Sequence, residues 1–136
     1  MEKSCSFSGF GNIFCGEVNG HADHEVRELM DCQADISGHL ASCGLSKLEI
    51  TEAQLILFRA GRFGVSDEQQ KYMQICSTHR SKLGRRWRPL RSCQYPGHTG
   101  AAQKYKKPRV INLQMSREVQ DLYGILVQIG SRKYSI

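Results

Sequence analysis

Four potential metal ligands near the middle of this chain constrain its fold more than any other feature. Cys76, His79, Cys93 and His98 follow one another with the spacing C-x2-H-x13-C-x4-H. Cysteine sulfur and histidine nitrogen are the ligands that zinc prefers in tetrahedral sites, and such ions commonly stabilise small domains. The spacing therefore predicts a zinc-stabilised domain in which these four side chains bind one Zn²⁺.

Local geometry supports the two halves of this predicted site. Residues three apart on a helix lie close together, which places Cys76 beside His79. The Pro96-Gly97 pair favours a tight turn that returns His98 toward Cys93. The layout resembles an atypical zinc finger. It differs from the C2H2 form because His stands in place of the second Cys, and Cys in place of the first His.

The remaining cysteines leave alternatives open. Cys32 and Cys43 are less favoured as ligands, because buried cysteines commonly behave as small apolar side chains. A looser set, spaced C-x9-C-x5-H-x2-H, is a candidate for a second ion: Cys5, Cys15, His21 and His24. The N-terminal residues contain no apolar segment typical of a secretory signal. We therefore expect a reducing compartment, where cysteines serve as metal ligands more often than as disulfides.

A run of strongly basic sequence overlaps the predicted metal site. Residues 79–109 contain ten Lys and Arg and no Asp or Glu, whereas a surface that is merely soluble normally mixes both signs. Dense cations suit contacts with the phosphate backbone of nucleic acids. The predicted nucleic-acid-binding residues are Arg80, Lys82, Arg85, Arg86, Trp87, Arg88, Arg91, Lys104, Lys106, Lys107 and Arg109. Trp87 can stack on bases or, alternatively, anchor the loop from beneath.

Charge is unevenly distributed along the chain. Residues 1–66 hold five Lys or Arg against nine Asp or Glu, a balance of −4. Residues 67–136 hold fourteen against four, a balance of +10. Such a division indicates an acidic structural half and a basic functional half.

These patterns favour a zinc-dependent DNA-binding domain of a nuclear transcription, chromatin or mobile-element protein, with double-stranded DNA as partner. The alternatives are a structural zinc module that docks an acidic protein, and an RNA-binding module. We do not expect an enzyme, since the metal region has no carboxylate to handle protons. No stretch reaches the roughly 18 apolar residues of a membrane span, so no membrane association is expected.

The predicted fold class is α+β and mainly helical. Apolar spacing and capping signals predict three N-terminal helices, over residues 22–42, 52–60 and 67–83. A short strand–helix–strand element should follow, with strands at 110–113 and 124–129 around a helix at 116–123. We expect an irregular segment at 1–20 and one zinc-binding domain at 21–136. Its parts are a helical part (21–84), a basic zinc loop (76–109) and a C-terminal β-rich element (110–136).

Overall fold

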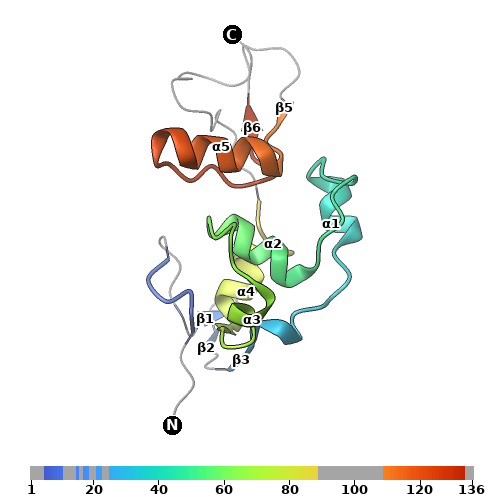
Figure 1. Cartoon of the computed structure of the whole chain (residues 1–136). Helices are drawn as coiled ribbons and strands as arrows, with labels where there is room; N and C mark the ends of the chain where they lie inside the picture. The colour runs from blue at the N-terminus through green and yellow to red at the C-terminus, as the bar shows by residue number, and fades with distance from the viewer. Residues whose placement is uncertain are drawn as a thin grey trace. The chain divides into compact units, whose positions relative to one another are not determined.

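The computed structural model describes residues 5–10, 15, 17–18, 21–22, 25–88 and 109–133 (Figure 1). The chain divides into two compact units: a first unit of residues 1–36 and 50–87, and a second of residues 37–49 and 88–136. Within the described residues it is a small, mainly helical α+β protein whose strands form two-stranded antiparallel sheets. No helix in these ranges has the length and apolar character needed to cross a bilayer.

The first unit contains short strands and short helices. β1 (Glu17–Val18) pairs with β2 (His21–Ala22), and β3 (Val26–Glu28) pairs with β4 (Gln74–Cys76). A 3-10 helix, η1 (Leu29–Asp31), follows β3 directly. The α-helices of this unit are α2 (Glu52–Arg59), α3 (Asp67–Gln70) and α4 (Ser77–Leu83).

The predicted starts of the helices at residues 52 and 67 are confirmed. Thr51 and Gln54 form a reciprocal capping box at the start of α2, which satisfies two backbone N–H groups. Ser66 and Gln69 form the same arrangement at α3. Both motifs lie within four consecutive residues, so they form without help from distant parts of the chain.

The long helix predicted over residues 22–42 is wrong. Residues 26–28 instead form β3, with Val26 opposite Cys76 and Glu28 opposite Gln74. The segment after η1 docks on the start of α2, where the Ala53 N–H donates to the Cys32 carbonyl. Among the described residues of this range, only α1 (Ser37–Ser42), which belongs to the second unit, is α-helical. Pairing with a strand that lies almost fifty residues away overrides the local helical periodicity.

The predicted helix at 67–83 is interrupted. α3 ends at Gln70, a turn leads to β4, and α4 begins only after Cys76. Tyr72, which falls inside the predicted helix, lies in that turn and is 83% exposed. The same β3–β4 pairing explains the interruption, because β4 must be extended to complete it.

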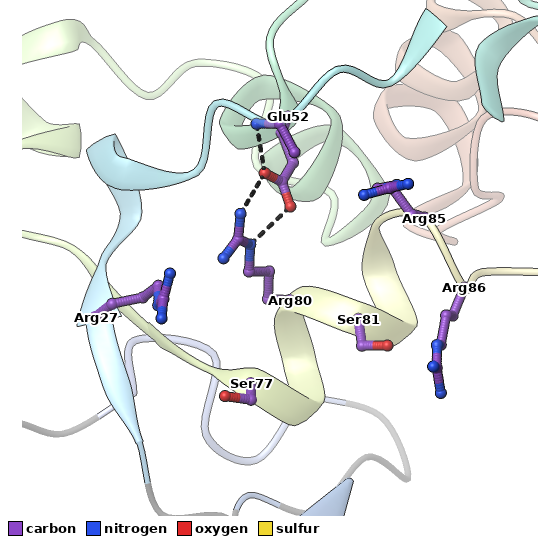
Figure 2. Close-up of a pocket in the computed structure, with 8 residues that line it drawn as sticks. Arg27, Glu52, Ser77, Arg80, Ser81, Arg85 and Arg86 are labelled. Atoms are coloured by element: carbon purple, nitrogen blue, oxygen red, sulfur yellow. Dashed lines mark hydrogen bonds and ion pairs between the residues drawn. The ribbon is translucent and has the colours of Figure 1, made fainter. Parts of the chain in front are cut away.

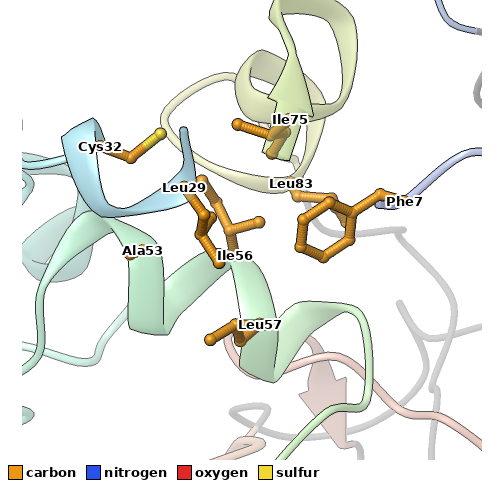
Figure 3. Close-up of a cluster of buried hydrophobic side chains, with 8 residues drawn as sticks. All are labelled: Phe7, Leu29, Cys32, Ala53, Ile56, Leu57, Ile75 and Leu83. Atoms are coloured by element: carbon orange, nitrogen blue, oxygen red, sulfur yellow. The ribbon is translucent and has the colours of Figure 1, made fainter. Parts of the chain in front are cut away.

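A small apolar core holds the first unit together (Figure 3). Its buried residues come from the loop 5–10, η1 and its C-cap, α2, β4 and α4: Phe7, Leu29, Cys32, Ala53, Ile56, Leu57, Ile75 and Leu83. The segment 1–20, predicted to be irregular, therefore supplies one of the largest side chains of this core, Phe7. Cys32 is fully buried here, in agreement with its alternative reading as an apolar side chain.

Arg59 is a fully buried cation at the end of α2. Its Nη1 donates to the carbonyls of Leu83 and Gly84, both at 3.0 Å, and so satisfies backbone acceptors at the end of α4. Its guanidinium also lies 3.9 Å from the ring centroid of Trp87. This side chain therefore links α2 to the end of α4.

The C-terminal part of the second unit contains β5 (Arg109–Val110), α5 (Leu113–Tyr123) and β6 (Arg132–Lys133), with β5 and β6 antiparallel. The structure also has a strand, a helix and a strand in this order, but only the first strand and the helix overlap the predicted ranges. Asn112 caps α5, which therefore begins before residue 116, where the helix was predicted to begin; Ser116 is buried inside the helix and donates to the Val127 carbonyl. The strand predicted at 124–129 is absent from these described residues, and β6 lies beyond them.

Candidate metal centre

The loop at residues 5–10 is held against β4 by backbone contacts. The Ser6 N–H donates to the Gln74 carbonyl at 2.7 Å, and the Gln74 N–H donates to Ser6 Oγ at 2.9 Å. Phe7 enters the core immediately afterwards. These contacts place Cys5 next to Cys76, at the end of β4, and the Cys76 N–H donates to Cys5 Sγ at 3.3 Å.

Cys76 and His79 belong to the junction between β4 and α4. Cys76 is the N-cap of α4, and its Sγ accepts a hydrogen bond from the His79 N–H at 3.4 Å. The His79 ring turns back to the same sulfur, with Nδ1 3.1 Å from Cys76 Sγ. The two residues predicted to share an ion therefore do lie together, although Cys76 has extended rather than helical backbone.

Cys5 and Cys15 complete a cluster with this pair. Their sulfur atoms lie 3.7 Å and 3.5 Å from His79 Nδ1, and the donor atoms of all four residues lie within 4.8 Å of one another. In tetrahedral zinc sites, metal–ligand distances of about 2.3 Å to sulfur and 2.0 Å to nitrogen separate neighbouring S and N ligands by about 3.5 Å. The observed spacing therefore fits a Cys3His site that can hold a metal ion such as zinc.

The electrostatics of the cluster also suit a cation. Burial raises the pKa of the Cys5 thiol, and desolvation together with the neighbouring thiols raises the pKa of Cys15 to about 12. Burial, aided by the charge of Lys82, lowers the pKa of His79, so its imidazole is neutral near pH 7. Three thiolates this close together repel one another unless a metal ion compensates their charge. A neutral imidazole is the form that binds metal.

Packing fixes the His79 ring in this orientation. The residue is fully buried, and its ring centroid lies 6.4 Å from that of Phe7. Nε2 is buried and has no hydrogen-bond partner among the described residues, whereas Nδ1 faces the three sulfur atoms. The ring therefore presents Nδ1 as its ligand atom.

The structure combines residues that the sequence assigned to two different sites. Cys76 and His79 come from the predicted first site, whereas Cys5 and Cys15 come from the predicted second one. Cys93, His98 and His24 lie outside the described residues, as does the side chain of His21. Their roles as ligands therefore stay predictions. The C-x2-H and C-x9-C spacings are present in the sequence. No sequence feature near either pair, however, indicates that the two pairs lie together in the fold.

The other two candidate cysteines lie elsewhere. Cys32 is part of the apolar core, where burial raises the pKa of its thiol to about 11. Cys43 is buried in the second unit, with its Sγ 3.7 Å from His39 Nε2. Neither belongs to the cluster of four.

The predicted basic residues have different environments. Four of them are exposed: Lys82, Arg85, Arg86 and Arg88. Trp87, in contrast, is only 6% exposed, and the Arg59 guanidinium packs on its ring. The arrangement supports the reading of Trp87 as an anchor rather than as a base-stacking surface. Four of the predicted residues lie outside the described ranges, and the side chain of a fifth is not described: Arg91, Lys104, Lys106, Lys107 and, for its side chain, Arg109.

Arg80 forms a bidentate ion pair with Glu52, the first residue of α2 (Figure 2). Its Nε and Nη2 each donate to a carboxylate oxygen at 2.8 Å, and the Ala34 N–H donates to Glu52 Oε1 at 3.0 Å. Burial disfavours the ionised carboxyl, but the hydrogen bonds from Arg80 and Ala34 outweigh burial and hold the pKa of Glu52 below its usual range. The pair joins α2 to α4.

This lowered pKa predicts a loss of stability in acid. The contribution of the ion pair should be complete above the ordinary Glu pKa of 4.5 and disappear as the pH falls through the lower folded-state pKa. Near neutral pH, Glu52→Gln should lower the free energy of unfolding by about 2 kcal/mol, because charge-assisted hydrogen bonds are lost. Urea unfolding of both proteins between pH 7 and pH 3 measures this difference. A difference that does not shrink in acid would contradict the assignment.

Comparisons of the chain with known protein families, with curated proteins and with solved structures gave no match. The function must therefore be inferred from the geometry of the site.

Proposed function

We propose that this chain is a zinc-dependent DNA-binding module. In this proposal Cys5, Cys15, Cys76 and His79 hold Zn²⁺, and the cations on and after α4 bind the phosphate backbone of double-stranded DNA. The observation that carries it is the position of the cluster at the start of α4. Two of its members are the N-cap and third residue of the helix that begins the acid-free basic run.

The ligand set supports a structural rather than a catalytic ion. Three cysteines and one histidine fill the four positions of a tetrahedral zinc site, whereas catalytic zinc keeps one position for water or substrate. Sulfur-rich sets also favour zinc over calcium or magnesium, which bind oxygen ligands. We therefore propose that the ion stabilises the fold and has no direct part in a reaction.

The exposed cations support a polyanionic partner. Lys82, Arg85 and Arg86 are exposed on α4 and in the residues just after it. Arginine binds phosphate through two parallel N–H groups, and base-independent phosphate contacts supply much of the affinity of DNA-binding proteins. A nuclear role in transcription, chromatin or mobile-element function is the setting that this chemistry fits.

The test measures bound zinc and affinity for duplex DNA on the same purified sample. With roughly five phosphate contacts, the plot of log affinity against log salt should have a slope of about −4 to −5. Lys82→Gln should make the slope shallower by about 0.9, since it removes one phosphate contact. Lys71→Gln is the matched control and should leave the slope unchanged. Lys71 is an exposed lysine in the turn after α3.

Other outcomes separate the alternatives. A slope near zero would reject nucleic acid as the partner and leave docking of an acidic protein as the function. Tighter binding to RNA than to duplex DNA of the same sequence would identify an RNA-binding module. Equal effects of Lys82→Gln and Lys71→Gln would show that net charge alone, and not the surface around α4, determines affinity.

A further inference from the structure

A polar hollow lies between β3 and α4 in the first unit (Figure 2). Its volume is about 540 Å³. Its walls carry mainly positive and hydroxyl side chains: Arg27 from β3, Ser77, Arg80 and Ser81 from α4, and Arg85 and Arg86 from the residues after α4. In Figure 2, Arg27 lies at one end of this group and Arg86 at the other, with Arg80 and its partner Glu52 between them.

The hollow has an excess of positive charge. Its lining holds four arginines and one glutamate, a formal balance of +3. The glutamate is Glu52, whose carboxylate already accepts three hydrogen bonds, two from Arg80 and one from Ala34. Those contacts hold the Arg80 guanidinium in one orientation while using two of its five N–H groups. An anion that enters the hollow can therefore contact the Arg80 guanidinium in a fixed orientation. The negative charge of Glu52 is already compensated by its own hydrogen bonds.

Arg27 is the informative member of this set, because it lies in the acidic half of the chain and outside the basic run. Its guanidinium pairs with Glu25, and the two side chains are 42% and 55% exposed. Exposed ion pairs of this kind are worth about 1 kcal/mol or less, so a phosphate can replace the carboxylate at little cost. Pairing of β3 with β4 is what brings Arg27 opposite α4.

We propose that this hollow binds one backbone phosphate of a nucleic acid, together with its sugar. The inference rests on the proposed function and names the contact that anchors α4. Arginine forks and serine hydroxyls are common donors to phosphate oxygens, and Ser77 and Ser81, four residues apart, lie on one face of α4. The volume falls within the ordinary range of ligand sites, at roughly 300–1,000 Å³.

The residues that line the hollow also indicate that it does not recognise bases. None of the described residues around it is aromatic, so they offer no surface on which a base can stack. The contact should therefore be independent of base sequence, and it should fix the position of α4 on the nucleic acid.

The experiment compares Arg27→Gln with Lys71→Gln in the zinc-loaded full chain. The two residues are well matched, because each is a cation of the first unit in an exposed ion pair with a nearby glutamate. With a random-sequence duplex, Arg27→Gln should weaken binding about fivefold at 0.15 M salt and make the salt slope shallower by about 0.9. Lys71→Gln should change neither.

Two further measurements complete the test. The double variant Ser77→Ala with Ser81→Ala leaves the charge unchanged and should weaken duplex binding about threefold to tenfold. Inorganic phosphate alone, followed by NMR of the arginine Nε–H signals, should bind only weakly. Saturation by phosphate below about 1 mM would instead assign the hollow to a free phosphate compound and overturn the proposal.

The outcomes separate this inference from the proposed function. If the parent protein binds duplex DNA but Arg27→Gln behaves like Lys71→Gln, the hollow is not a phosphate site, and the DNA-binding function stands. If the parent protein does not bind DNA or RNA, the proposed function fails and this inference fails with it.

Discussion

Removal of the proposed zinc ion by a chelator is expected to unfold the first unit of this protein. Cys5 and Cys15 are 74 and 64 positions from His79 in the sequence, so an ion held by the cluster would join distant segments across a small apolar core. Structural zinc contributes an apparent binding energy of about 10–16 kcal/mol in small zinc-finger peptides at neutral pH. Whole domains are stable by only about 5–15 kcal/mol, so the core should not hold the fold without the ion.

Native mass spectrometry and circular dichroism, each before and after addition of a strong chelator, measure this result. We expect one zinc ion at the cluster, lost together with helical signal and with the cooperative unfolding transition. A chain that contains no metal as purified and still unfolds cooperatively would contradict both the ion and its structural role.

Single cysteine variants identify the ligands. Cys15→Ser is the sharpest, because this residue is exposed and its replacement should disturb packing little apart from the loss of the ion. Cys32→Ala is the matched control, since Cys32 is buried in the same unit but lies outside the cluster.

Cys93→Ser distinguishes the two ligand sets. Retention of the cluster ion supports the structure, whereas loss of that ion from Cys93→Ser but not from Cys5→Ser would restore the set predicted from spacing.

Replacement of Arg59 by alanine should destabilise the first unit by about 3 kcal/mol, a large effect for one residue at a distance from the metal cluster. The change leaves the buried carbonyls of Leu83 and Gly84 without this donor and removes the guanidinium from the Trp87 ring. It also opens a cavity where the aliphatic part of the side chain was packed. The end of α4 should loosen first, because Arg59 holds both of those carbonyls.

Two comparisons make the Arg59 prediction specific. Arg59→Met keeps most of the buried volume but not the donors, and should cost about 2 kcal/mol for the unpaired acceptors. Arg62→Ala is the control, since Arg62 is exposed, its side chain donates to the Ser6 carbonyl, and its guanidinium lies 5.1 Å from the Phe7 ring centroid. Its cost should be below about 1 kcal/mol. Urea unfolding of the zinc-loaded proteins gives all three values. Equal effects of Arg59→Ala and Arg62→Ala would refute the role of Arg59.

The elements predicted correctly have signals contained within a few residues. The capping boxes at Thr51 and Ser66 start α2 and α3, and each depends on hydrogen bonds between residues three apart. Gly124, with a positive φ of 66°, ends α5 where the predicted C-terminal helix ends. Such interactions are nearly independent of the rest of the chain, so the sequence is sufficient to find them.

The residues predicted wrongly are those that pair over long distances. Residues 26–28 have helical spacing of apolar side chains, yet their backbone bonds to β4. The pairing interrupts two predicted helices, brings Arg27 opposite α4 and leaves Cys76 extended at the start of that helix. Periodicity within one segment carries no information about a partner strand.

The sequence by itself determined that this chain carries Cys–His pairs with metal-ligand spacing and a basic run without acids. It also determined the starts of α2 and α3 and the end of α5. Only the tertiary structure decided which pairs meet: the loop at 5–10 docks on β4, which places Cys5 beside Cys76, and Cys15 and His79 join the same cluster. The physical reason is that metal ligation needs atoms within a few ångströms, and for residues far apart in sequence only strand pairing and core packing set that distance.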